Sequence, residues 1–85
     1  MDELPKVLGR LIARKRRAKG LSQEKLAELA GVHRTYISQI ERGLKSPTVA
    51  VLIQISIALG ISAGSLLSEL EKQLGRIHRQ TRFRN

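Results

Sequence analysis

The amino-acid sequence predicts an all-α fold, a compact domain of five short helices. Apolar residues recur at intervals of three and four, the spacing of one helix face, and no segment alternates between apolar and polar residues as a strand does. Residue types that favour helix starts, and glycines that favour helix ends, divide the chain into five segments. A chain of 85 residues makes one domain, with a core so modest that association would help to stabilise it.

The first helix is expected over residues 5–19. Pro5 suits the first turn of a helix, because its missing N–H would be unpaired there in any case. Gly20 is expected to end the helix. The apolar side of this helix is predicted to contain Val7, Leu8, Leu11, Ile12 and Ala18.

Ser22 is the expected N-cap of a second helix over residues 23–30, and Gly31 is its expected C-cap. A third helix follows over residues 34–42 and ends at Gly43. The residues of the second helix predicted to point inward are Leu26, Ala27, Leu29 and Ala30.

Thr48 is the expected cap of a fourth helix over residues 49–59, which Gly60 terminates. Ser62 is the expected cap of a fifth helix. The apolar residues of the fifth helix are Leu66, Leu67, Leu70 and Leu74.

The chain is strongly basic, with 16 Lys and Arg against 7 Asp and Glu, and a net charge of +9. Such an excess on a small domain indicates a polyanionic partner. We expect one domain over residues 1–74 and a frayed, basic C-terminal tail over residues 75–85. Two interpretations of the tail arginines are open, phosphate contact or simple solvation: Arg76, Arg79, Arg82 and Arg84.

The sequence gives no support for a metalloprotein, a membrane protein or an enzyme. There is no cysteine, and His33 and His78 are far apart without acidic neighbours, so we expect no metal and no other cofactor. The longest apolar run, residues 49–53, is too short for a membrane span, and the N-terminus has no signal core, so we expect a cytoplasmic protein without a membrane partner. No nucleophile–base pair, phosphate-cradling loop or small-molecule pocket is evident, and we expect no enzyme.

The second and third helices are separated only by residues 31–33, which is the layout of a helix-turn-helix over residues 23–42. Ala27 is small where the two helices must cross, and Gly31 permits a left-handed turn. The apolar contacts that set the crossing angle are expected from Val32, Ile37 and Ile40.

One side of the third helix carries no acid and no aliphatic residue, opposite Ile37 and Ile40. Its side chains are of the types that read base edges or hold phosphates, although a plain solvated face is the alternative. Arg34 is the best candidate for a bidentate contact to guanine. The side consists of Arg34, Thr35, Ser38, Gln39 and Arg42, with Tyr36 and Glu41 on its flanks.

Residues 21–43, together with 46–48 and 55–61, resemble the lambda-repressor/Cro-like (XRE) helix-turn-helix family. The run RTYIS at residues 34–38, with Glu41 to Gly43, is similar to the controller proteins of restriction–modification systems. Three places depart from the family pattern. His33 stands where Ser or Thr usually caps the recognition helix, and Ser56 stands where alanine is typical. Ala63 and Gly64 replace the acidic and bulky residues that often open the fifth helix, so the start of that helix is left open.

The resemblance implies a transcriptional regulator that binds a palindromic operator as a homodimer, with its recognition helix at 34–42 in the major groove of double-stranded DNA. It also implies an ion pair between Arg16 and Glu41 that ties the first helix to the recognition helix. The residues implied to contact bases or phosphates are Gln23, Arg34, Thr35, Tyr36, Ser38, Gln39, Arg42 and Lys45.

The fourth helix has two apolar sides, which points to a partner for one of them. Leu52, Ile55 and Leu59 form the side expected in the core. The other side predicts an isologous homodimer, with scattered exposed apolar residues as the alternative. The predicted dimer surface consists of Ala50, Ile53 and Ile57, edged by Ser65, Ser68 and Glu69.

Two other functions compete with a dimeric regulator. An antitoxin-like autoregulator would also bind a protein partner, for which residues 75–85 are the only candidate segment. A nonspecific or RNA-binding basic protein would need stacking aromatic side chains, and only Tyr36 and Phe83 are present.

Overall fold

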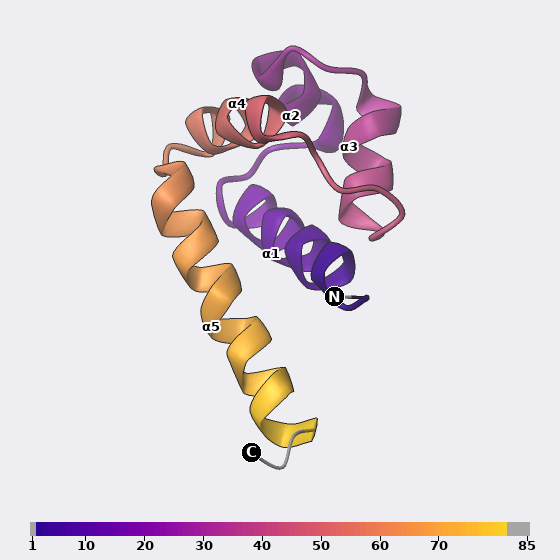
Figure 1. The fold of residues 1–85 in the computed structure, drawn as a ribbon. Helices are drawn as coiled ribbons and strands as arrows, with labels where there is room; N and C mark the ends of the chain where they lie inside the picture. Colours follow the sequence, from indigo (N-terminus) through magenta and orange to yellow (C-terminus); the bar gives the residue numbers. More distant parts are fainter. Residues whose placement is uncertain (1, 82–85) are drawn as a thin grey trace.

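The computed structural model describes the backbone of residues 2–81 and the side chains of residues 2–77, and it contains five helices within that range (Figure 1). The all-α, five-helix fold predicted from the sequence is confirmed. The helices are α1 (Leu4–Ala18), α2 (Gln23–Ala30), α3 (Arg34–Glu41), α4 (Val49–Leu59) and α5 (Ala63–Thr81).

Helix α1 occupies a central place in the domain (Figure 1). It packs against α3 on one side and against α5 on the other. Helix α2 packs against α3 and α4, so that α3 is held by α1 and α2 together. Among the described helices no single one has the length and apolar character to span a membrane; only α4 taken with residues 63–77, at a bend of 103°, meets both conditions.

One apolar core joins all five helices. Ile37 and Ile40 of the third helix are fully buried, as the helical wheel predicts. The remaining side chains expected at the centre are buried as well: Leu11, Leu26, Ala27, Leu52, Ile55 and Leu59.

The helix boundaries follow the capping residues. The hydroxyls of Ser22, Thr48 and Ser62 each accept a hydrogen bond from the backbone N–H three residues later, at 2.9, 3.2 and 2.9 Å. Gly31 and Gly60 end α2 and α4 in the left-handed conformation, with φ of 72° and 73°. These caps are the ones that the sequence predicts.

Three residues assigned to apolar sides are exposed in the structure. Leu29 and Leu67 are 48% and 41% exposed, and Ala18 is exposed too. A helical wheel shows the direction in which each side chain points from the helix axis. The width of the buried face, however, is set by the packing of the neighbouring helices. In the last turn of α1 the buried side chain is Arg16, which occupies the inward position instead of Ala18.

Gly75 does not end the fifth helix, which continues to Thr81, so the frayed tail predicted from Gly75 onward is wrong as far as Thr81. A glycine inside a helix lowers the stability of that helix by about 1 kcal/mol relative to alanine. Here the side chains on both sides of Gly75 pack against the core, which favours the continued helix. Leu74 is buried and Ile77 packs against the core. The predicted tail residues Arg82 and Arg84, and the side chain of Arg79, lie outside the described part of the chain.

At Gly9 the backbones of α1 and α3 lie close together. A Cβ atom built on Gly9 would overlap the carbonyl oxygen of Ile40 and lie 2.8 Å from that of Glu41. Because both are backbone atoms, they cannot move aside as a flexible side chain would. The glycine therefore sets the separation of the two helices.

We expect Gly9→Ala to destabilise the domain by about 1–3 kcal/mol, since the added methyl group must push α1 away from α3. Urea denaturation followed by circular dichroism measures this change. Gly64→Ala is the matched control, because the nearest atom to its added Cβ, Ser62 Oγ, is 3.9 Å away. Equal midpoints for Gly9→Ala and the unmodified protein would contradict the close approach.

Candidate nucleic-acid interface

The turn between α2 and α3 is closed by backbone hydrogen bonds. Val32 N donates to Ala27 O at 3.0 Å, and Gly31 N donates to Glu28 O at 3.2 Å. Val32 is partly buried against the core. The side chain of His33 makes no capping bond, and its carbonyl oxygen instead accepts from the first turn of α3. Helices α2 and α3 therefore form a tight helix-turn-helix.

The face of α3 opposite Ile37 and Ile40 is open to solvent. Arg34, Thr35 and Arg42 are exposed there. Tyr36, Ser38 and Gln39 are partly exposed, and Lys45 lies exposed in the segment that follows α3. The side chains of α3 predicted to contact DNA are therefore accessible to solvent, at least in part, and so is Lys45.

The acid of the third helix is turned away from this surface. The side chain of Glu41 is only 5% exposed, and that of Arg16 only 10%. Arg16 Nε donates to Glu41 Oε2 at 2.7 Å, and Arg16 Nη2 donates to Glu41 Oε1 at 3.0 Å. The third donor, Nη1, reaches Leu21 O at 2.8 Å. This bidentate pair links the end of α1, the α1–α2 turn and α3.

The hydrogen bonds to Glu41 raise the pKa of Arg16 above its ordinary value, against the opposing effect of burial. An arginine guanidinium is charged at physiological pH, so Arg16 and Glu41 form an ion pair there. A carboxylate turned inward and neutralised in this way adds no repulsion toward a DNA phosphate.

Gln23, predicted to contact a phosphate, lies at the first residue of α2 but is already engaged. Its Nε2 donates to Glu41 Oε1 at 2.9 Å. The Glu41 carboxylate thus accepts three hydrogen bonds from two other helices. Sequence reasoning missed this bond, because no local pattern relates two residues 18 positions apart. One amide proton of Gln23 is left for a phosphate oxygen.

A groove of about 380 Å³ lies beside Gln23 and Arg42, and α1 supplies its other wall. The arginines of that wall were not singled out in the sequence, although Arg10, Arg14 and Arg17 recur at intervals of four and three, the spacing of one helix face. They extend the basic surface from α3 onto α1. The lining residues are Arg10, Ala13, Arg14, Arg17, Gln23, Glu41 and Arg42.

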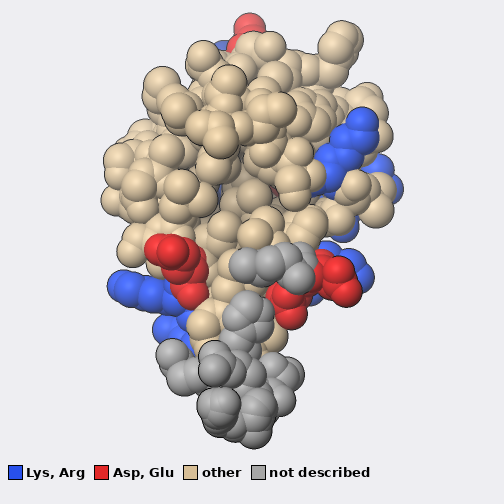
Figure 2. Space-filling model, viewed as in Figure 1, with Lys and Arg blue, Asp and Glu red and all other residues tan. Residues whose placement is uncertain are grey.

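The outer side of α4 forms an uncharged surface. Ile53 is 43% exposed, Ile57 is 68% exposed, and Ala50 is exposed beside them. Val49, which the sequence analysis did not include, is 75% exposed. Residues 46–68 contain no charged side chain, and Figure 2 shows an uncharged surface over α4 with charges gathered at its margins.

Of the three residues predicted at the edge of this surface, two are exposed on α5 and the third is paired with α1. Ser65 and Ser68 are exposed on α5. Glu69 is instead turned toward α1, where its carboxylate lies 2.9 Å from Lys15 Nζ and 3.6 Å from Arg14 Nη2. The hydrogen bond from Lys15, with the charges of Lys15 and Arg14, lowers the pKa of Glu69 below its ordinary value. Among the described residues no group of three or more His, Cys, Asp or Glu could hold a metal ion.

A family model described as helix-turn-helix, HTH_3, matches residues 12–66. The HTH-type transcriptional regulator y4dJ of Sinorhizobium fredii is 37% identical over 70 residues, which cover 82% of this chain and 91% of the relative. The control protein C.SmaI of Serratia marcescens is 38% identical over 66 residues, covering 78% of this chain and 79% of the relative.

Solved structures agree with the sequence relatives. The restriction–modification controller protein C.AhdI from Aeromonas hydrophila has a TM-score of 0.71 at 35% identity, over 73% of this chain and 94% of that one. The clp gene regulator ClgR from C. glutamicum has a TM-score of 0.75 at 33% identity, over 82% of this chain and 91% of that one.

Proposed function

Because this chain belongs to the HTH_3 helix-turn-helix family, we propose that it represses or activates genes by binding a palindromic operator as a homodimer. Its relatives are transcriptional regulators and controller proteins, and the chain is a DNA-binding regulator, not an enzyme. The likeness to C.SmaI and C.AhdI supports a small regulator of the controller type.

The observation that carries this proposal is the exposed face of α3. It presents two arginines with neutral hydrogen-bonding side chains, and Glu41, the acid of that helix, is buried in a pair with Arg16. An electropositive helix surface of this composition is suited to the major groove, where bases offer both acceptors and donors. Arg34 is at the first residue of α3, and in helix-turn-helix proteins the N-terminal residues of the recognition helix approach the bases.

The proposed contacts divide into two kinds. Arg34, Thr35, Ser38 and Gln39 would reach base edges, with Tyr36 at the border of this set. Gln23, Arg42 and Lys45 would contact phosphates, which position the protein without reading sequence. Gln23 would be helped by the backbone N–H groups at the start of α2.

The uncharged outer side of α4 supports the homodimer. Three apolar side chains, Val49, Ile53 and Ile57, are 75%, 43% and 68% exposed, and no charge interrupts them. A contiguous apolar patch of this kind on a small protein marks an association surface. A two-fold dimer would present two α3 helices to successive major grooves about 34 Å apart.

We expect Arg34→Ala to lower the affinity for the operator by about 1–3 kcal/mol while leaving the affinity for random DNA largely unchanged, because a bidentate guanine contact is lost. Gln23→Ala should weaken binding to all DNA sequences alike, because the proposed contact of Gln23 is to a phosphate of the DNA backbone. Selection from a random-sequence library identifies the operator, and titration of selected and scrambled duplexes gives the two affinities.

The ratio of the two affinities decides the assignment. If Arg34→Ala leaves the ratio of operator to scrambled-DNA affinity unchanged, Arg34 does not read a base. If the unmodified protein selects no sequence at all, the proposal of a sequence-specific regulator is wrong.

A further inference from the structure

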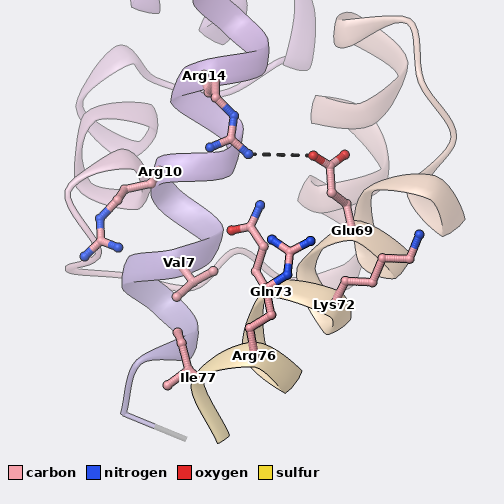
Figure 3. A pocket seen from close by; sticks show the side chains of 8 residues that line it. All are labelled: Val7, Arg10, Arg14, Glu69, Lys72, Gln73, Arg76 and Ile77. Atoms are coloured by element: carbon pink, nitrogen blue, oxygen red, sulfur yellow. Dashed lines mark ion pairs between the residues drawn. The ribbon is translucent and has the colours of Figure 1, made fainter. Parts of the chain in front are cut away.

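A second groove, of about 580 Å³, runs between α1 and α5 (Figure 3). It lies outside the helix-turn-helix, and of its residues only Arg76 was considered a candidate for phosphate contact from the sequence. Apolar side chains, Val7 and Ile77, line one end, and the remainder of the wall is polar or charged. The charged and polar residues of the wall are Arg10, Arg14, Glu69, Lys72, Gln73 and Arg76.

Two guanidinium groups and one amide point into the space between the helices. Figure 3 shows Arg14 reaching from α1 toward Glu69, and Gln73 and Arg76 rising between α5 and α1. Arg10 and Lys72 stand at the two rims and point outward. The side chain of Arg14 is 58% exposed, so a ligand can reach it.

The charges in this groove are unbalanced. Four basic side chains line it, and among the described residues Glu69 is the single acid of the wall. That acid is already shared, because Lys15 binds it from outside the groove at 2.9 Å and Arg14 lies at 3.6 Å. One carboxylate is therefore divided between two cations, Lys15 and Arg14. Cations gathered in this way repel one another unless an anion compensates them.

The groove is continuous with the proposed DNA surface. Arg10 and Arg14 line both this groove and the smaller one beside Gln23 and Arg42. The outer side of α1 is therefore a basic ridge between two basic grooves. A DNA strand whose phosphates contact Arg42 would therefore have Arg10 and Arg14 as the next basic side chains beside it.

We propose that the α1–α5 groove is a phosphate-binding site, in which Arg14, Gln73 and Arg76 hold a phosphate of the DNA that flanks the operator half-site. The inference rests on the proposed DNA binding and extends it to a surface outside the helix-turn-helix. Planar guanidinium groups donate to phosphate oxygens in pairs, and a glutamine amide adds a further donor. A nucleotide or inorganic polyphosphate offers the same oxygens, and continuity with the α3 surface favours DNA.

The test compares a duplex of the selected operator alone with one extended by ten base pairs at each end. The variant Arg14→Gln/Arg76→Gln removes both guanidinium groups and keeps polar side chains of similar length. For the extended duplex, it should lower the slope of log K against log salt by about 1–2, because each phosphate contact releases about one counterion. On the short duplex its slope should equal that of the unmodified protein.

The variant Lys19→Gln/Lys25→Gln is the matched control, because it removes the same charge from exposed residues that line neither groove. It should bind both duplexes with nearly the same slopes as the unmodified protein. A melting curve of each variant shows whether it is folded.

Glu69→Gln tests the same site in the opposite direction. Removing the acid frees Arg14 and Lys15, so the affinity for the extended duplex should increase while that for the short duplex stays the same. Chemical-shift titration of the unmodified protein with inorganic pyrophosphate is the second arm. Shifts in Gln73 that vanish in Arg14→Gln/Arg76→Gln, with no change in the binding of that variant to either duplex, would support a free phosphate ligand as the source.

The proposal is overturned if Arg14→Gln/Arg76→Gln matches the lysine control on the extended duplex and pyrophosphate shifts neither Gln73 nor Arg76. This outcome is distinct from failure of the proposed function, in which the unmodified protein would not prefer the short operator duplex over scrambled DNA.

Discussion

Replacing Arg16 with alanine should destabilise the folded protein by about 3–5 kcal/mol, because it leaves a buried carboxylate without its cation. The Glu41 side chain is 5% exposed and would retain only the hydrogen bond from Gln23. Leu21 O would also lose the donor that now lies at 2.8 Å. Native proteins have about 5–15 kcal/mol of stability, so this single change should remove much of it.

Thermal denaturation measures the effect, and a loss of this size lowers the melting temperature by at least about 12 °C in a domain of this length. Arg17→Ala is the control, since Arg17 is exposed on the next residue of the same helix. If Arg16→Ala keeps its melting temperature and loses DNA affinity instead, Arg16 contacts a phosphate and the pair has no structural role.

A double variant separates the loss of the pair from the cost of an isolated charge. Arg16→Met/Glu41→Leu replaces both partners with apolar side chains, and such replacements are often neutral or stabilising. We expect the double variant to recover most of the stability that Arg16→Ala loses. A double variant as unstable as the single one would show that the cost lies in packing and in the Leu21 contact.

Ile57→Glu should give a folded monomer whose affinity for the full palindrome is about 10²–10⁴-fold lower, because the second half-site is no longer bound by a linked subunit. Ile57 is 68% exposed in the protomer, so a charge there costs the fold little but cannot be buried against a second copy. Sedimentation equilibrium gives the oligomeric state, and titration of the palindrome gives the affinity.

Ala18→Glu is the matched control for this change, because Ala18 is an exposed apolar residue on α1 and lies away from the outer side of α4. It should remain dimeric and bind the palindrome normally. An unmodified protein that is monomeric at high micromolar concentration would refute the homodimer. A dimer in which Ile53 and Ile57 stay accessible to solvent would refute its placement on α4.

Much of the fold could be predicted from local sequence. The starts of α2, α4 and α5 are set by Ser22, Thr48 and Ser62, and capping depends only on residues within one turn. The end of α5 could not be predicted from Gly75, because the helix continues through this glycine to Thr81. The cost of a glycine within a helix is local, but the packing of Leu74 and Ile77 that outweighs it comes from other helices.

In the candidate site, the features that depend on a single helix could be predicted from the sequence, and the contacts between helices could not. The periodicity of α3 separates Ile37 and Ile40 from the exposed Arg34, because one helix contains all three. The bond from Gln23 to Glu41 and the pairing of Glu69 with Lys15 join different helices. Such contacts depend on tertiary packing, which one helical wheel does not contain.

The recognition helix has only eight residues, a length at which an isolated helix in water is unstable. Its order is supplied by the rest of the molecule, through the buried Ile37 and Ile40 and the three hydrogen bonds that Glu41 accepts from α1 and α2. Backbone amides of α3 should therefore exchange with solvent deuterium only when the whole domain opens. DNA would then meet a helix that is already rigid, and binding would not be slowed or weakened by the entropy of folding it.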